Sequence, residues 1–192
     1  MTATTELERQ LKPGRVYRRE DLELWSKSVD RELAQLVRSG RLRKLRHGLY
    51  CRPKTSVFGE VPPDDRALVR AFLKSEDFLL FSPNAYHALG LGTTQLANAC
   101  VVYNMKRHGR IELAGRVFEF RRRPGYPHRM DPEFLAVEIF NNLDRLAEDR
   151  ETVEARLKDR VRSFDAGRLL RHARRFGKVR TRRFFEAALA GE

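Results

Sequence analysis

The sequence of 192 residues has few of the features that mark exported or membrane-embedded proteins. It contains two cysteines, Cys51 and Cys100, so a disulfide framework is not expected. Its longest apolar run, Ala99–Tyr103, has five residues, whereas a membrane helix needs about 20. The first six residues have neither a basic start nor an apolar stretch, so no signal peptide is expected. These absences predict a soluble, cytoplasmic protein that has no membrane partner.

The sequence also lacks the motifs by which common catalytic and cofactor sites are recognised. It has no His-Glu-x-x-His motif, no close cysteine pair, no Walker loop and no dinucleotide-binding glycine triplet. Both cysteines are expected to pack as small apolar groups, His87 to serve packing, and His47 to lie in a turn. We therefore expect a protein that is not an enzyme, with no catalytic residues, no metal and no cofactor.

Positive charge is what the sequence has in excess. Its 39 Lys and Arg outnumber its 26 Asp and Glu, which gives a net charge of +13. Residues 1–59 contribute +7 and residues 60–192 contribute +6, so the shorter segment is the more densely charged. Two stretches, 40–54 and 168–183, contain no acidic residue. Because most of their cations are Arg, whose guanidinium can donate paired hydrogen bonds to phosphate, this distribution favours a nucleic-acid partner.

The first 58 residues have the pattern of three helices followed by a β-hairpin. The third helix is expected to begin near Ser26, a good N-cap, and to stop at Gly40. A tight turn at His47-Gly48 is expected to join two short strands. This order is typical of a winged helix-turn-helix, whose third helix enters the major groove while the hairpin contacts the DNA backbone. The expected helices are 4–11, 19–25 and 26–39, with a brief extended piece at 16–17 and strands at about 42–45 and 49–51.

The third predicted helix has an apolar face and an opposite polar face. Val29, Leu33 and Leu36 follow helical spacing, so they are expected to point into the core. The opposite face carries hydrogen-bonding side chains and no carboxylate, and such side chains can bind guanine and adenine edges. The residues expected to read DNA bases are Lys27, Ser28, Arg31 and Gln35. Those expected to contact the DNA backbone are Arg38, Arg41, Arg43, Lys44, Arg46 and Arg52.

The remainder of the chain predicts a second domain. Residues 55–63 fit neither helical nor strand periodicity and are interpreted as a linker. Asp131-Pro132-Glu133 is a strong helix start, and the chain is expected to end in two basic helices that meet at Gly177. The predicted fold class is α+β: an N-terminal winged helix-turn-helix followed by a mixed α/β domain with a helical C-terminus. The predicted domains are residues 1–58, which bind DNA, and residues 59–192. Strands are expected at 78–81, 100–103, 111–113 and 117–120, and further helices at 64–75, at 84–89 and around 153–164.

Several segments resemble a known family. Gly14–Tyr17, Val29–Gly40 and Leu45–Thr55 look like the N-terminal winged helix of the AbiE-type (AbiEi) antitoxins, and Ala85–Gln95 is similar to a motif that follows in that family. The similarity covers roughly residues 10–125. It implies an antitoxin of a bacterial type IV toxin–antitoxin system that binds double-stranded operator DNA and represses its own operon. It also implies that the second domain counteracts a nucleotidyltransferase-like toxin without forming a stable complex with it.

Two alternatives remain open at this point. A nucleic-acid-processing enzyme of nuclease type would need clustered acids and a nearby Lys, and Glu119-Phe120-Arg121 resembles such a strand end with Arg in place of the Lys. An RNA-binding protein would use the basic C-terminus instead. The possible secondary contacts to nucleic acid are Arg171, Arg174, Arg175, Lys178 and Arg182.

Overall fold

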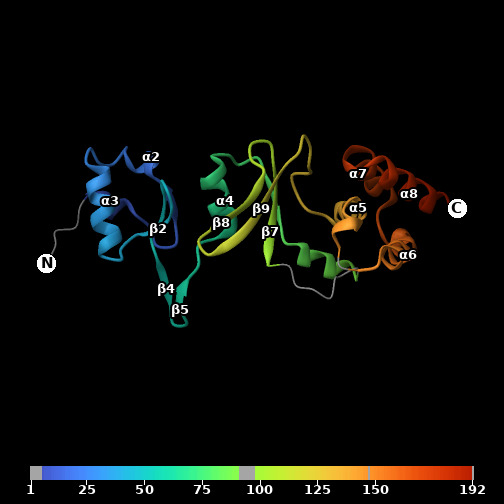
Figure 1. Cartoon of the computed structure of the whole chain (residues 1–192), viewed down its shortest axis with the longest axis horizontal. Helices are drawn as coiled ribbons and strands as arrows, with labels where there is room; N and C mark the ends of the chain where they lie inside the picture. Colours follow the sequence, from blue (N-terminus) through green and yellow to red (C-terminus); the bar gives the residue numbers. More distant parts are fainter. Residues whose placement is uncertain (1–5, 91–97, 147, 192) are drawn as a thin grey trace. The chain divides into compact units, whose positions relative to one another are not determined.

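The computed structural model describes residues 6–90, 98–146 and 148–191. This part of the chain is a mixed α+β protein that ends in helices, as predicted (Figure 1). None of its helices is long and apolar enough to cross a bilayer.

The described chain packs into two compact units. One unit is the chain up to Glu76 together with Ile111–Val117, and the other is Asp77–Arg110 together with the chain from Phe118 onward. A compact unit is not the same as an independently folding domain, so the domain boundary after residue 58 stays a prediction.

The first unit begins with helices packed on a small antiparallel sheet. The strand order is β1-β3-β2, and Tyr50 of β3 pairs with Tyr17 on one side and with Lys44 on the other. Gly48, in the turn between β2 and β3, has a φ of 69°, a conformation that glycine adopts without strain. The elements are α1 (Glu6–Gln10), β1 (Val16–Arg18), α2 (Arg19–Leu22), α3 (Val29–Arg38), β2 (Arg43–Arg46) and β3 (Leu49–Cys51), drawn in blue to blue-green in Figure 1.

Two predicted helix boundaries in this unit are wrong. The third helix begins at Val29 rather than near Ser26, because the Ser26 hydroxyl accepts the Ser28 N–H (3.0 Å) and forms a turn before the helix. The second helix ends at Leu22 rather than at Trp25, whose N–H closes a turn onto the Leu22 carbonyl (3.1 Å). Residues 4 and 5 of the first predicted helix lie outside the described residues.

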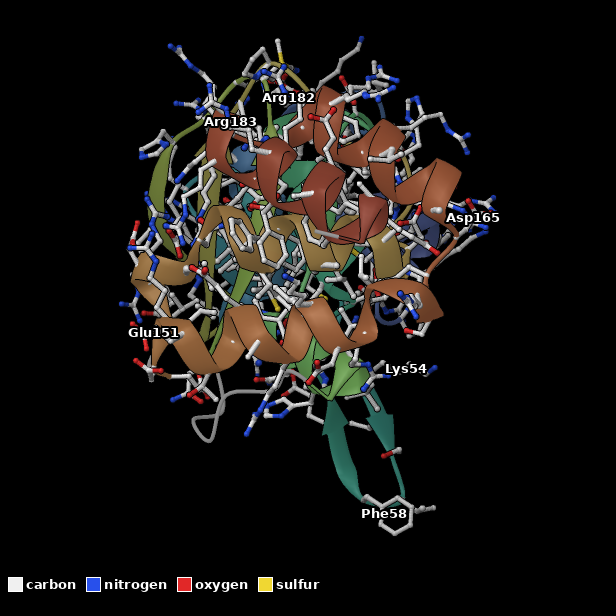
Figure 2. The ribbon with its side chains drawn as sticks, turned by 90° about the vertical axis from the view of Figure 1, so that its right-hand side faces the viewer. Lys54, Phe58, Glu151, Asp165, Arg182 and Arg183 are labelled. Carbon is white, nitrogen blue, oxygen red and sulfur yellow. The ribbon has the colours of Figure 1, made fainter. Side chains whose placement is uncertain are left out.

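The segment that was interpreted as a linker forms a hairpin. Strands β4 (Lys54–Ser56) and β5 (Gly59–Val61) pair antiparallel, and their connection is Val57-Phe58. The side chains at this tip are 93% and 98% exposed, and Phe58 stands at the end of the hairpin in Figure 2. The strands are too short for an alternating pattern to mark them in the sequence. The next helix, α4 (Asp65–Leu73), was predicted, and the carboxylate of Asp64 caps it by accepting the Ala67 N–H (2.8 Å).

The second unit contains most of a four-stranded sheet and the C-terminal helices. The strand order is β6-β7-β9-β8, and the predicted strands all occur in it. The helix predicted over 84–89 is the 3-10 helix η1 (Pro83–Leu89), and residues 91–95 of the motif Ala85–Gln95 lie outside the described part of the chain. The strands are β6 (Leu79–Phe81), β7 (Ala99–Asn104), β8 (Gly109–Leu113) and β9 (Arg116–Arg122). The helices are α5 (Pro132–Asn141), η2 (Leu143–Arg145), α6 (Arg150–Arg160), η3 (Val161–Ser163), α7 (Ala166–Phe176) and α8 (Val179–Ala190).

Helix α5 is the centre of the second unit. It begins where predicted, because the Asp131 carboxylate accepts the Phe134 N–H (2.7 Å) and Pro132 occupies the first turn. Every residue of the helix after Pro132 is buried, so α5 is surrounded by other elements rather than lying on the surface. Its Asn141 side chain donates to the Phe176 carbonyl (3.1 Å) and accepts the Lys178 N–H (2.9 Å), which joins α5 to the junction of α7 and α8.

Candidate nucleic-acid interface

The outer face of α3 carries two of the four residues predicted to read DNA bases, and the other two come just before the helix. The burial of Val29, Leu33 and Leu36 sets the rotation of the helix, as their spacing predicted. The opposite face of the helix is in contact with solvent. The exposed side chains are Lys27, just before the helix, and Arg31, Gln35 and Arg38 within it.

Two carboxylates on α3 lie beside this face, and both are held by neighbouring residues. Asp30 accepts two hydrogen bonds from the guanidinium of Arg19, each 2.6 Å long, and these bonds hold the pKa of the Asp30 carboxyl below its usual value. Glu32 accepts hydrogen bonds from the hydroxyls of Ser26 (2.6 Å) and Ser28 (3.1 Å). Asp30 is thus paired with a cation, and Glu32 is hydrogen-bonded to two hydroxyls. The hydroxyl of Ser28, predicted to read bases, already has a partner within the protein.

Arg19 adds to this candidate surface a contact that the sequence did not reveal. It lies at the start of α2, eleven residues before Asp30, and no local spacing relates the two. Its contact with Asp30 arises only because the turn after α2 brings the first turn of α3 back toward it.

Three of the six cations predicted to contact the DNA backbone form ion pairs or hydrogen bonds with residues elsewhere in the first unit. Arg41 pairs with Glu8 of α1 (2.5 Å), and Arg43 pairs with Glu60 of β5. Arg52, which is half-buried, donates a hydrogen bond to the carbonyl of Leu11. These three cations link the sheet and the hairpin to neighbouring segments. Their guanidinium groups therefore already have partners within the protein.

The other three predicted backbone contacts are exposed and form no ion pair in the part of the chain that the structure describes. Arg38 donates to the Ala34 carbonyl of its own helix at 3.4 Å, a weak contact. The Arg46 guanidinium lies 5.7 Å from the centre of the Phe72 ring, a cation–π contact with α4. Lys44 forms no ion pair within the described residues. Exposed charge on β2 therefore comes from Lys44 and Arg46.

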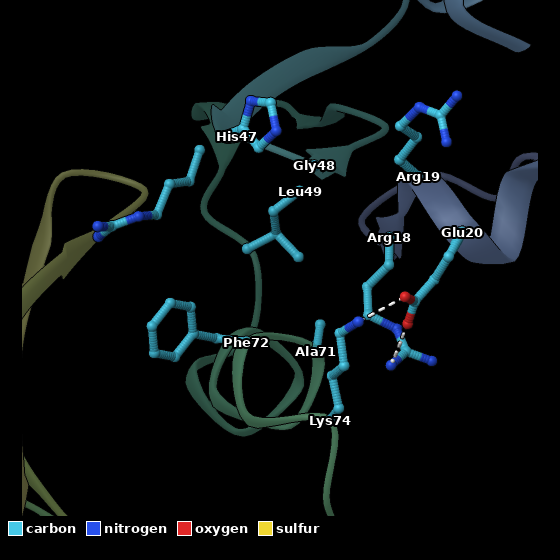
Figure 3. A pocket seen from close by; sticks show the side chains of 10 residues that line it. Arg18, Arg19, Glu20, His47, Gly48, Leu49, Ala71, Phe72 and Lys74 are labelled. Atoms are coloured by element: carbon cyan, nitrogen blue, oxygen red, sulfur yellow. Dashed lines mark hydrogen bonds and ion pairs between the residues drawn. The ribbon is translucent and has the colours of Figure 1, made fainter. Parts of the chain in front are cut away.

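A cleft of about 380 Å³ lies beside the turn between β2 and β3 (Figure 3). Glu20, the one carboxylate among the lining residues, lies between Arg18 (2.8 Å) and Lys74 (2.5 Å). Leu49 and Phe72 supply apolar surface. The lining residues are Arg18, Arg19, Glu20, Arg46, His47, Gly48, Leu49, Ala71, Phe72 and Lys74.

The second unit carries the other basic surface, on helices α7 and α8. Leu169, Ala173 and Phe176 of α7 are buried, which turns its arginines outward. Arg182 and Arg183 of α8 project from the surface in Figure 2. Of the possible secondary contacts, Arg174 pairs with Glu186 (3.2 Å), Arg175 lies over the Phe176 ring, and Lys178 donates to the Asn141 carbonyl (2.6 Å), while Arg171 and Arg182 are exposed.

The groups considered for catalysis have ordinary structural surroundings. Arg121 donates two hydrogen bonds to Glu119 (2.8 and 3.0 Å), and they lower the pKa of the Glu119 carboxyl. Burial raises the pKa of the Cys51 thiol, which keeps it protonated and unreactive at neutral pH. Within residues 6–90, 98–146 and 148–191, no three His, Cys, Asp or Glu side chains gather as metal ligands would.

Comparison with known proteins gives one likeness and two negative results. No family model matches the chain, and no curated protein matches it. The fold is similar to the crystal structure of the RV2827C protein from Mycobacterium tuberculosis, with a TM-score of 0.56 and 20% sequence identity. The likeness covers 96% of this chain and 73% of the other. At this identity it concerns the fold alone.

Proposed function

We propose that this chain is a DNA-binding transcriptional repressor whose reading head is a winged helix-turn-helix formed by α1 to β3. The order helix, strand, helix, helix, strand, strand, with an antiparallel sheet in the order β1-β3-β2, supports this assignment. In such a head α3 enters the major groove, and the hairpin of β2 and β3 lies along the phosphates.

One observation carries the proposal: Arg31 and Gln35 on the exposed face of α3, with Lys27 just before the helix, face solvent. Beside them Asp30 is paired with Arg19 and Glu32 accepts hydrogen bonds from serine hydroxyls. Arg and Lys can donate to the O6 and N7 acceptors of guanine, and the Gln amide can bind adenine through both its donor and its acceptor. Lys44 and Arg46, exposed on β2, are the side chains that fit phosphate contacts. The first unit thus combines groups for base reading with groups for positioning.

The test begins with selection of duplexes from a randomised DNA pool by the wild-type chain. Arg31→Ala should weaken binding to the selected duplex by about 1–3 kcal/mol and reduce the preference over scrambled DNA, because the guanidinium would contact a base edge. Fluorescence anisotropy with both duplexes measures this preference.

The matched control is Arg9→Ala, which removes one exposed Arg of α1. It should leave the preference for the selected duplex over scrambled DNA unchanged. If Arg31→Ala lowered the two affinities equally, α3 would not be the reader. Selection of single-stranded RNA in place of any duplex would favour the RNA-binding alternative, and cleavage of the DNA with a divalent metal would favour the nuclease alternative.

The antitoxin role rests on the family resemblance of Gly14–Tyr17, Val29–Gly40 and Leu45–Thr55. We propose that the chain represses its own operon and counteracts a nucleotidyltransferase-like toxin without a stable complex. Growth of cells that express the neighbouring gene, with and without this chain, tests the proposal. The expected result is rescue of growth without co-purification of the two proteins, and an absence of rescue would contradict it.

A further inference from the structure

Arg19 connects three parts of the proposed reading head. Its peptide N–H donates to the Gly48 carbonyl in the turn between β2 and β3 (2.9 Å). Its Nε and Nη2 donate to the two oxygens of Asp30 on α3, and Nη1 donates to Glu23. In Figure 3 the guanidinium of Arg19 points away from Phe72 and Lys74, and its hydrogen bonds direct it to Asp30 of α3.

The negative charge of Asp30 favours the stability of α3 but opposes the approach of DNA. A carboxylate in the first turn of a helix is stabilised by the helix dipole, which favours Asp at this position of α3. The same carboxylate is exposed (72% of its side-chain surface), and it lies one residue from Arg31, about 100° away around the helix. A free negative charge there would repel DNA phosphates beside the reading face.

The bidentate contact resolves this conflict. A guanidinium that donates two parallel hydrogen bonds to a carboxylate matches it in geometry as well as in charge. The backbone bond to Gly48 fixes the point from which the Arg19 side chain extends, so the contact requires little rearrangement of the chain. The pair leaves Asp30 able to stabilise the first turn of α3 without presenting an uncompensated charge.

We propose that Arg19 is a positioning residue for DNA binding that acts through Asp30, masking the carboxylate of α3 so that Arg31 and its neighbours can approach the duplex. The inference rests on the proposed function, and it assigns Arg19 no direct contact with DNA.

The experiment compares Arg19→Ala, Asp30→Asn and the double variant R19A/D30N on a duplex selected with the wild-type full-length chain. Arg19→Ala should weaken binding about tenfold, because Asp30 is then unpaired beside the phosphates. Asp30→Asn should bind within about threefold of wild type. The double variant should recover to within about threefold, because the Asp30 carboxylate that Arg19 masks beside Arg31 is then absent; Glu23, the other partner of Arg19, stays in place in every variant.

Two measurements separate this role from a general loss of charge or of structure. Arg9→Ala removes an exposed, Glu6-paired Arg and should leave affinity unchanged. Thermal melting identifies a folding defect, and Arg19→Gln, which keeps part of the side-chain stem and removes the charge, repeats the comparison if Arg19→Ala melts early.

A measurement made without DNA tests the contact between Arg19 and Asp30 independently of the proposed function. The carboxyl pKa of Asp30, followed by NMR titration, should rise in Arg19→Ala because two hydrogen bonds to the charged form are lost. An unchanged pKa would overturn the inference whatever the DNA results. A double variant that binds as weakly as Arg19→Ala would overturn it too, since Arg19 would then contact DNA itself. If the wild-type chain selected no duplex although the Asp30 pKa did rise, the proposed function would be wrong and the masking role for DNA would fall with it.

Discussion

At the scale of single residues, two side chains of the same type differ in role when their ion-pair or hydrogen-bond partners differ. Arg31 and Arg43 are both exposed arginines of the first unit, but Arg43 pairs with Glu60 while Arg31 faces solvent. Asn141 shows the same dependence in the second unit, where a buried amide satisfies backbone groups of two other helices.

Asn141→Ala should destabilise the protein by about 2–4 kcal/mol. The side chain is 6% exposed, and its loss leaves the Phe176 carbonyl, the Lys178 N–H and the Thr181 hydroxyl (2.7 Å from Oδ1) without this partner. Urea denaturation followed by circular dichroism measures the free energy of unfolding. Asn98→Ala, the same change at an exposed position, serves as control and should alter it little. Equal effects of the two substitutions would contradict the role assigned to Asn141.

At the scale of elements, side-chain caps mark where α5, α6 and α7 of the second unit begin. Asp131, Asp149 and Asp165 each accept a backbone N–H three residues later, at 2.7, 2.9 and 2.8 Å. These contacts are local, and they explain why α5 begins where the sequence predicted.

The cap of α7 gives a pH-dependent prediction. The hydrogen bond from the Arg168 N–H lowers the pKa of Asp165, so the folded state favours the charged carboxylate. The stabilisation is present above the usual carboxyl pKa and is lost as the pH falls through the lowered value in the folded protein. Asp165→Ala should therefore reduce the melting temperature by a few degrees at pH 7 and by less at strongly acidic pH.

Asp165→Asn is the matched control for this cap. Asn also accepts the backbone N–H, so it should retain most of the stability, with less dependence on pH. Calorimetry of the three proteins between neutral and acidic pH tests the cap, and a difference between wild type and Asp165→Ala that did not shrink in acid would contradict it.

At the scale of the whole molecule, the net charge of +13 should govern association with nucleic acid. If about six phosphates are neutralised, the logarithm of the affinity should fall with the logarithm of the salt concentration at a slope of about −5. Replacing Lys44 and Arg46 by Ala should flatten this slope and weaken selected and scrambled duplexes alike, because phosphate contacts carry no sequence information.

Anisotropy titrations at several salt concentrations measure the slope. Replacing Arg41 and Arg52 by Ala is the informative comparison, because these cations bind Glu8 and the Leu11 carbonyl within the protein. Their loss should change the slope less than the loss of Lys44 and Arg46. An affinity that did not vary with salt would remove the electrostatic basis of the proposal.

The sequence by itself determined the buried face of α3, the capped starts of α4 and α5, and the strands other than those of the β4–β5 hairpin. Val29, Leu33 and Leu36 lie on one face because the α-helix repeats every 3.6 residues. Asp131 caps α5 by accepting a hydrogen bond from the N–H of Phe134, three residues later. Such features depend on neighbours along the chain, so they can be read from it.

Only the tertiary structure decided which cations are available to a partner. Arg41 pairs with Glu8 across 33 residues, Arg43 with Glu60 across 17, and Arg19 with Asp30 across 11. The hairpin at residues 54–61 likewise appears in no periodic pattern, because strands of three residues are defined by their pairing. An ion pair between distant residues depends on the path that the folded chain takes between them, and no local spacing in the sequence records that path.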